Sequence, residues 1–309
     1  MALIRWLCDV KVWVFSAIIL ALLFGFDHPS SADLMVIVLI VQMTLALDGL
    51  VFSRGDLKTY SKDMALSLIA CFMVNTILTL AIGSFFIGDT DLWYGWVMLA
   101  SVPCAVSVIT AALYMRGDVK LAMMGLTIVY VASLAVTPLL TYFLLGEAVN
   151  PLELFKYIVL FIAIPFGLCI PLRKLRLPHT PKVIGINIFM FLMVFIALGS
   201  RRDYMFSDPG VVMWILVASF VRVFVFGFLM MFLLSRIKVT RDRGITFLMM
   251  SCWKNSGLSV SLCIIILGIS HPQAVLPCAI SLVVESVWFA VATGLVDRIW
   301  PVIREPSQS

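Results

Sequence analysis

The chain has 309 residues, of which 62% are hydrophobic and only 13% are charged, and its mean hydropathy is +1.11. This composition excludes a soluble domain and indicates an all-α polytopic membrane protein. The net charge of +5 would suit a nucleic-acid partner, but the basic residues fall in alternate predicted loops. We therefore expect no nucleic-acid binding and interpret the charge as a topology signal.

Cysteine and histidine usage narrows the chemistry further. Seven cysteines are scattered without a CxxC pair, mostly in apolar segments, and the three histidines fall in predicted loops. No disulfide framework, metal site or cofactor is predicted. No Ser/His pair or close Asp pair offers catalytic geometry, so we do not expect an enzyme.

Apolar windows of about 20 residues predict ten transmembrane helices. They lie near 10–27, 33–52, 64–87, 92–115, 120–145, 154–172, 183–200, 210–235, 244–268 and 273–296. Ten spans divide into two halves of five, and an odd number per half inverts the second half relative to the first. The sequence therefore predicts two inverted five-helix repeats.

Basic residues mark one side of this topology. The loops and termini on that side carry seventeen of the 22 basic residues, whereas the opposite loops carry only Lys156, Arg201 and Arg202. The opposite loops are instead rich in Asp and Glu. By the positive-inside rule, both termini are predicted to be cytoplasmic, in a plasma or inner membrane.

Four charged residues fall inside predicted spans: Asp48, Arg222, Lys254 and Glu285. Each ionised side chain at a helix centre costs about 2.5–3.5 kcal/mol on insertion scales, so all four need partners. Arg222 and Glu285 are interpreted equally well as a structural ion pair or as functional groups. For Asp48 and Lys254 we favour a functional role over a structural pair.

Two spans contain helix breakers. The ninth reads S-C-W-K-N-S-G-L-S-V-S-L over Ser251–Leu262, with Gly257 as the breaker, and the fourth contains Pro103. Corresponding interruptions in the two halves are typical of a transporter's binding site at the membrane midplane, although a Gly-containing helix with a buried Lys is the plainer alternative. The candidate substrate or ion site comprises Lys254, Asn255, Ser256, Ser107, Thr110, Asn75 and Asp48.

Several motifs resemble the bile acid:sodium symporter family: P-C-A-V-S-V-I-T-A-A-L-Y-M-R-G-D-V (Pro103–Val119), T-P-L-L at Thr137, N-S-G-L-S-V-S-L (Asn255–Leu262) and A-V-L-P at Ala274. D-G-L at Asp48 and G-D-L at Gly55 take the place of two further family elements. The resemblance implies broken fourth and ninth helices that cross, and alternating access between two domains. The core domain would comprise spans 3–5 and 8–10, and the panel domain spans 1, 2, 6 and 7.

The sequence departs from this family at its first sodium site. The family's polar ligands there fall on Val108, Ile109, Ala122 and Leu126, none of which can coordinate sodium. Its Glu and Gln before Asn-Ser-Gly fall on Met250 and Lys254, so a carboxylate is lost and a positive charge gained. The lysine ammonium could replace a bound sodium ion by neutralising the C-terminal ends of half-helices.

Arsenite efflux carriers are similar in fold and offer an alternative. Their fourth-helix Cys falls on Cys104 and their tenth-helix Glu on Glu285, and Phe195–Pro209 resembles the end of their seventh helix. Their paired Asn and Glu of the ninth helix are not retained. A buried Cys is also more often plain packing.

The expected function is a sodium-independent secondary transporter of a small organic anion, coupled to protons or working by exchange. If Lys254 releases its proton during the cycle, it couples transport to pH, whereas a lysine that stays charged replaces sodium or contacts the anion. The alternatives are metalloid efflux through Cys104 and Glu285, and a membrane sensor that keeps a transporter scaffold without transporting.

Overall fold

The computed structural model describes residues 6–26, 28–47, 58–175 and 177–301, and the regular elements of this part of the chain are helices. The candidate site residue Asp48, together with the motifs that begin at Asp48 and Gly55, lies outside the described residues.

In chain order the elements are α2 (Val10–Phe24), α3 (Ser31–Leu47), α5 (Ser61–Leu68), η1 (Ile69–Asn75), α6 (Thr76–Gly83), η2 (Ser84–Phe86), α7 (Thr90–Ser101), α8 (Val108–Tyr114), α9 (Val119–Leu145), η3 (Gly146–Ala148), α10 (Pro151–Lys174), α11 (His179–Gly199), α12 (Arg202–Ser207), α13 (Pro209–Phe220), η4 (Val221–Val225), α14 (Phe226–Arg236), α15 (Arg241–Cys252), α16 (Ser256–Leu262), η5 (Cys263–Leu267), η6 (Pro272–Ala274) and α17 (Val275–Ile299). Of the η elements, η1, η4 and η5 are π-helical and the other three are 3-10 turns.

Polar residues fix where several helices begin. Asp89, Asp118, Asn150 and Asp208 accept hydrogen bonds from backbone N–H groups in the first turns of α7, α9, α10 and α13. Such caps satisfy donors that the helix itself cannot pair. Pro151 and Pro209 occupy the first helical position of α10 and α13, where no backbone N–H is needed.

Six helical stretches of the described residues are long and apolar enough to cross a membrane: Ser61–Phe86, Val119–Leu145, Pro151–Lys174, Thr180–Gly199, Pro209–Arg236 and Pro272–Ile299. The helices α2 and α3 are shorter, with 15 and 17 residues. The fourth and ninth predicted spans are each divided by an interruption, so neither forms one long helix. The count of ten spans therefore stays a prediction.

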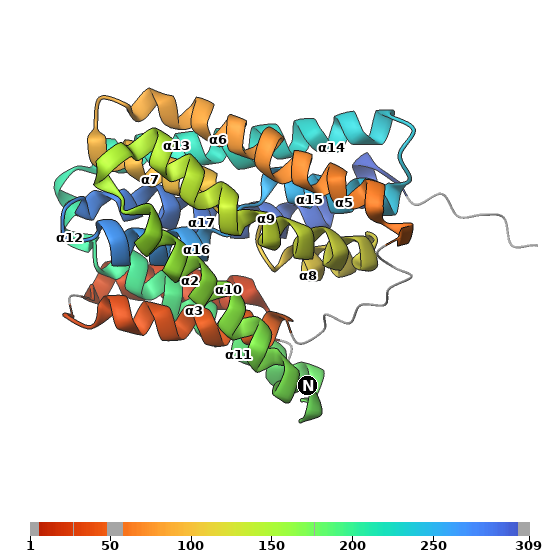
Figure 1. Ribbon diagram of the computed structural model, residues 1–309, viewed down its shortest axis with the longest axis horizontal. Helices are drawn as coiled ribbons and strands as arrows, with labels where there is room; N and C mark the ends of the chain where they lie inside the picture. The colour runs from red at the N-terminus through yellow and green to blue at the C-terminus, as the bar shows by residue number, and fades with distance from the viewer. Residues whose placement is uncertain (1–5, 27, 48–57, 176, 302–309) are drawn as a thin grey trace, which may run out of the picture.

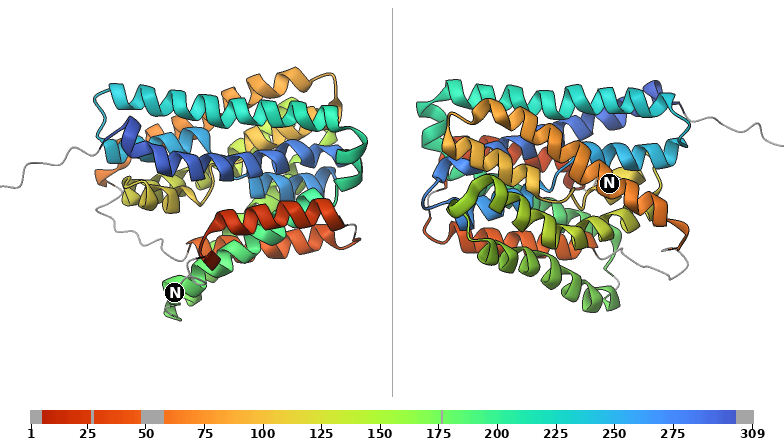
Figure 2. Two further views of the ribbon diagram at one scale, coloured as in Figure 1. Left: turned by 180° about the vertical axis from the view of Figure 1, so that it is seen from behind. Right: turned by 45° about the horizontal axis from the view of Figure 1, so that its top comes forward.

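The helices run roughly along one direction and form layers around α17 (Figure 1). Helix α11 packs against α2 and α3, and α10 against α3, on one side, whereas α13 packs against α17 on the other. The view from behind shows α17 between these two groups (Figure 2). Helix α17 also contacts α7 and α16, so the two interrupted segments lie in the interior, where most of their residues are buried.

Candidate functional site: the crossing of the interrupted helices

The two interruptions meet each other. One spans residues 102–107 between α7 and α8, and the other spans residues 253–255 between α15 and α16. Cys104 and Lys254 form an isolated antiparallel bridge, and the backbone N–H of Asn255 donates to the carbonyl oxygen of Pro103 at 2.8 Å. Each interruption therefore supplies partners for backbone groups that the other leaves unpaired, which is the requirement for a helix break inside a membrane.

Lys254 lies at this crossing, is fully buried and donates hydrogen bonds to three oxygen atoms. Its Nζ donates to the Thr76 hydroxyl at 2.8 Å, to the Val102 carbonyl at 3.0 Å and to the Cys71 carbonyl at 3.2 Å. The Phe72 ring centroid lies 5.4 Å from Nζ, within cation–π range. Val102 follows the last residue of α7, so Nζ binds the negative end of a half-helix.

The bonding pattern among the described residues fits the ammonium form of Lys254. The Thr76 hydroxyl donates its own proton to the carbonyl of Ala100 at 2.8 Å, so it accepts from Lys254. The other two partners are carbonyl oxygens and can only accept. Three acceptors match the three N–H groups of an ammonium, whereas a neutral amine would point its lone pair at one of them.

Glu285 of α17 carries the opposite charge on the other side of the break. Its Oε1 accepts from Arg222 Nη2 at 2.5 Å and from the backbone N–H of Lys254 at 3.3 Å. Its Oε2 accepts from the Ser256 hydroxyl at 2.6 Å. All three donors converge on a fully buried carboxylate. The ammonium of Lys254 therefore binds backbone carbonyl oxygens, whereas the carboxylate of Glu285 binds a backbone N–H group.

Arg222 lies in the π-helical segment η4 and is fully buried. Its Nη2 pairs with Glu285, while its Nε and Nη1 have no hydrogen-bond partner among the described residues. The structure therefore brings these two intramembrane charges together. Glu285 reaches Lys254 only through the backbone amide, so the side chain of Lys254 does not pair with this carboxylate.

Asn255 and Gly257 shape the start of α16. The Asn255 Oδ1 accepts from the N–H of Leu258 at 3.1 Å, and its Nδ2 donates to the Tyr130 hydroxyl at 2.7 Å. Gly257 was predicted to break the helix, but this prediction is wrong, because Gly257 lies within α16, after the interruption. A Cβ at Gly257 would lie 2.9 Å from Cε of Met193, so the glycine lets the end of this side chain from α11 pack closely against α16.

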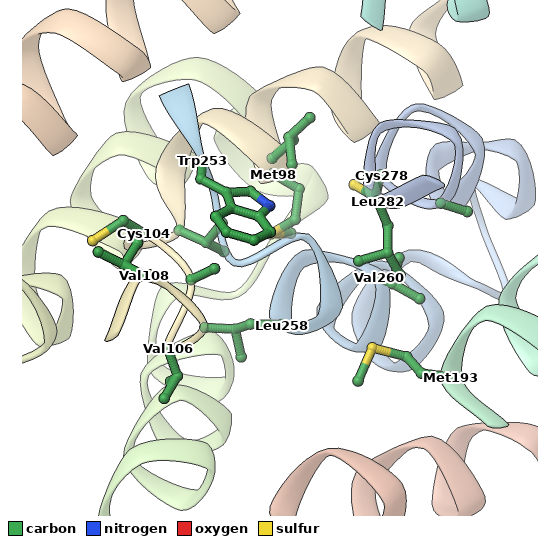
Figure 3. Close-up of a cluster of buried hydrophobic side chains, with 14 of the residues drawn as sticks. Met98, Cys104, Val106, Val108, Met193, Trp253, Leu258, Val260, Cys278 and Leu282 are labelled. Atoms are coloured by element: carbon green, nitrogen blue, oxygen red, sulfur yellow. The ribbon is translucent and has the colours of Figure 1, made fainter. Parts of the chain in front are cut away.

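Apolar side chains surround the polar contacts. Cys104, Val106, Trp253 and Leu258 from the two interruptions gather in one buried cluster, and Met193 of α11 lies beside it (Figure 3). These apolar side chains shield the ammonium and the carboxylate from water. Interactions between charges are stronger in such an interior than in solvent.

The other predicted site residues lie at different depths. Asn75 is fully buried next to Thr76, and its Oδ1 accepts from the Thr79 hydroxyl. Ser107 is half-buried directly before α8, and Thr110 is exposed on α8, away from the Lys254 contacts. Sequence reasoning missed Thr76, whose position beside Asn75 in an apolar helix was a usable signal, and Tyr130, for which no such signal exists.

Among the described residues, no group of three or more His, Cys, Asp or Glu side chains could hold a metal ion. Cys71 and Cys104 are both buried at the crossing, where the Cys71 carbonyl accepts from Lys254 and Cys104 forms the bridge with Lys254. Glu285, which the metalloid alternative combines with Cys104, is instead bonded by Arg222 and Ser256.

Apolar helices of spanning length, together with two interrupted helices that meet around buried charges, define a membrane protein of the transporter class. The model of the Sodium Bile acid symporter family matches residues 33–208, more than half of the chain. The chain therefore belongs to this family and is an integral membrane protein. A search of curated proteins finds no match. Lys254 and Glu285 lie beyond the matched residues, so their arrangement is known from the structure alone.

Proposed function

We propose that the protein is a sodium-independent secondary transporter that moves a small organic anion by alternating access. The observation that carries this proposal is the position of Lys254, whose ammonium binds three oxygen atoms at the crossing of the interrupted helices. Family membership supports transport through a bilayer.

Lys254 supports sodium independence. A monovalent cation at a helix crossing would be held by carbonyl and hydroxyl oxygens, and here those oxygens are bonded to a covalently attached ammonium. Near the first sodium position, Val108, Ala122 and Leu126 are buried apolar residues without ligand atoms. The residues present therefore do not fit a sodium ion.

The charge balance at the crossing supports an anionic substrate. Among the described residues, Lys254 and Arg222 are countered by the single carboxylate of Glu285, and all three side chains are fully buried. This leaves one positive charge in excess at a place where charge is costly. An anion that approaches the crossing would be favoured by this excess.

Two structural parallels support an inverted repeat. The helical stretch before each interrupted segment carries a π-helical insertion near its middle, η1 in Ser61–Phe86 and η4 in Pro209–Arg236. Both insertions contribute to the crossing, through the Cys71 carbonyl and through Arg222. π-helical insertions are rare and often lie at functional sites, so matched insertions favour two related halves of five spans.

The packing supports a division into core and panel. The helices α2, α3, α10 and α11 pack against one another as the panel would, and α11 meets the crossing through Met193. On this proposal, the panel moves relative to a core that holds the charged crossing. Both termini would be cytoplasmic, in a plasma or inner membrane.

Coupling by exchange is favoured over a lysine that releases its proton. Three acceptors bind Nζ in this conformation, so deprotonation of Lys254 would leave one of them facing a lone pair. A proton-coupled cycle would have to break this arrangement in another conformation.

The test uses the purified protein in proteoliposomes. A thermal-shift screen of carboxylates, sulfonates and sodium first identifies a ligand, since a compound that binds only the folded state raises its stability. Uptake of that ligand is then measured with sodium, potassium or choline outside, and after a pH step. We expect uptake that is insensitive to the cation, and a rate that rises with the sodium gradient would refute the proposal.

Arsenite efflux is kept as a second candidate because Cys71 and Cys104 are both buried at the crossing. Two thiols form a softer binding site than the Cys104 and Glu285 pair of the original alternative. A strain that expresses the protein should tolerate arsenite better than one with Cys104→Ala if this candidate is correct. A sensor without transport activity gains support only if no solute moves.

A further inference from the structure

We infer that Cys263 and Cys278 are a modification site, a pair of thiols that a small disulfide compound oxidises to a cystine. Both are free thiols in this structure, and their sulfur atoms lie 3.7 Å apart. Cys263 is the first residue of the π-helical segment η5, and Cys278 lies in the first turn of α17. Helix α16, which η5 continues, packs against α17, so a bond between the two sulfurs would join neighbouring helices.

The predicted topology puts both cysteines at the same depth. Cys263 lies five residues before the end of the ninth predicted span at 268, and Cys278 lies five residues after the start of the tenth at 273. The short turn between these spans therefore brings the two positions level with each other, in agreement with the contact of their sulfur atoms. On the proposed topology this turn faces the outside of the cell, where disulfides form and persist.

The same interface carries a second contact two helical turns away. The Ser256 hydroxyl donates to Glu285 at 2.6 Å, and Ser256 precedes Cys263 by seven residues, as Cys278 precedes Glu285. Residues seven apart share one face of a helix. The cystine would therefore restrain the interface that positions Glu285 beside the interruption before α16.

The oxidation needs a disulfide compound as the oxidant and proceeds by two exchanges. The thiolate of one cysteine attacks a sulfur of the oxidant, forms a mixed disulfide and releases one thiol. The thiolate of the other cysteine then attacks the cysteine sulfur of this mixed disulfide, forms the Cys263–Cys278 bond and releases the second thiol. Two electrons pass to the oxidant, and the two cysteine protons end on the two released thiols.

The buried surroundings favour a cystine over a bound metal ion. Both cysteines are buried, and the Cys278 thiol lies 3.3 Å from the carbonyl oxygen of Gly95 in α7. No third His, Cys, Asp or Glu completes a metal site there among the described residues. A monovalent copper ion held by two thiolates would leave a net negative charge in an apolar interior, whereas a cystine carries no charge.

The segment after Cys263 gives an oxidant access to the sulfur atoms. Three residues of η5, Ile264–Ile266, are only partly buried, and Ile269 in the following turn is fully exposed. Local opening of such a segment costs less free energy than global unfolding. A small apolar disulfide compound can therefore reach the pair without unfolding the protein.

The test treats the purified full-length protein in detergent with 4,4′-dithiodipyridine, a small aromatic disulfide. The protein is then alkylated under denaturing conditions and digested without reductant, and its peptides are identified by mass spectrometry. We expect the peptides that contain Cys263 and Cys278 to be joined by a disulfide. The melting temperature should rise by about 5–10 °C, since closing a loop of about 15 residues restricts the unfolded chain, and a reductant should reverse the rise.

Cys252→Ser is the matched control, because it removes another buried cysteine, whose sulfur contacts the Ser251 hydroxyl. It should keep the linked peptides and the rise in melting temperature, whereas Cys263→Ser and Cys278→Ala should each lose both. Absence of the linked peptides from the treated wild-type protein, or an equal rise in melting temperature in Cys263→Ser, would overturn the inference. The inference goes beyond the proposed function, since neither measurement depends on transport.

Discussion

The strongest prediction concerns Lys254→Ala, which removes the charged group from the crossing and leaves its partners in place. The deleted atoms correspond to n-propylamine, because alanine keeps only the Cβ of the lysine side chain. We expect Lys254→Ala to be less stable than the wild type and to be rescued by added n-propylammonium. An ammonium that simply fills space would show no such preference for a charged rescuer.

The magnitude follows from the three contacts of Nζ. The carbonyls of Cys71 and Val102 lose a donor, while the Thr76 hydroxyl keeps its bond to Ala100. At about 1–3 kcal/mol for each buried group left unsatisfied, the free energy of unfolding falls by about 2–6 kcal/mol. The substitution also removes the desolvation cost of a buried ammonium, which raises the free energy of unfolding and so offsets part of this loss. n-Propylammonium at 100 times its Kd should return about 2.7 kcal/mol.

Thermal unfolding of the purified variant in detergent provides the assay. The melting temperature is recorded with n-propylammonium, with n-propanol as a neutral molecule of the same shape, and with choline as a cation too large for the cavity. Only n-propylammonium should stabilise Lys254→Ala, and it should leave the wild-type protein unchanged. Equal effects of n-propylammonium and n-propanol would refute the tethered-cation interpretation, because the rescue would then be apolar filling.

Three further predictions follow from the same contacts and from the predicted topology. Glu285→Gln leaves Arg222 buried without its counter-charge and should lower the free energy of unfolding by about 3–5 kcal/mol, whereas Arg222→Met added to it should recover part of that loss, as measured by chemical denaturation. Lys254→Gln should retain exchange of substrate in proteoliposomes, since its amide can still donate to the Thr76 hydroxyl or a carbonyl, and complete loss of exchange in a folded variant would contradict this. Cysteine probes should label position Lys120 only from the cytoplasm and position Asp208 only from outside, and a reversal of either would break the inverted repeat.

The sequence predicted the interruptions because their causes are local. Pro103 lacks a backbone N–H, and a polar Lys-Asn-Ser run in an apolar segment disfavours a continuous helix there. The structure divides both segments at these places, at residues 102–107 and 253–255. Gly257 was less informative, since a glycine within a helix marks either a break or a close contact, and here it marks the contact with Met193.

The partners of Lys254 could not be predicted in the same way. Among the described residues, Nζ binds two backbone carbonyls and a hydroxyl from positions 152 to 183 residues away in the chain. Every residue carries a carbonyl, so no side-chain pattern marks the ones that are free. Their availability depends on the π-helical insertion at Cys71 and on the end of α7 at Val102, which are properties of the backbone.

On the proposed function, the placement of the two charges would let this scaffold dispense with a bound cation. The ammonium of Lys254 binds carbonyl oxygens, the negative end of a half-helix, and the carboxylate of Glu285 binds an amide, so each charge matches the backbone dipole it meets. A bound sodium ion could satisfy the same carbonyls, but it could also leave and carry the energy of its gradient into the cycle. A tethered ammonium cannot leave. On the proposed function, the fixed charge keeps the crossing intact in every state, and the driving force for accumulation has to come from the substrate gradients themselves or from a proton carried elsewhere.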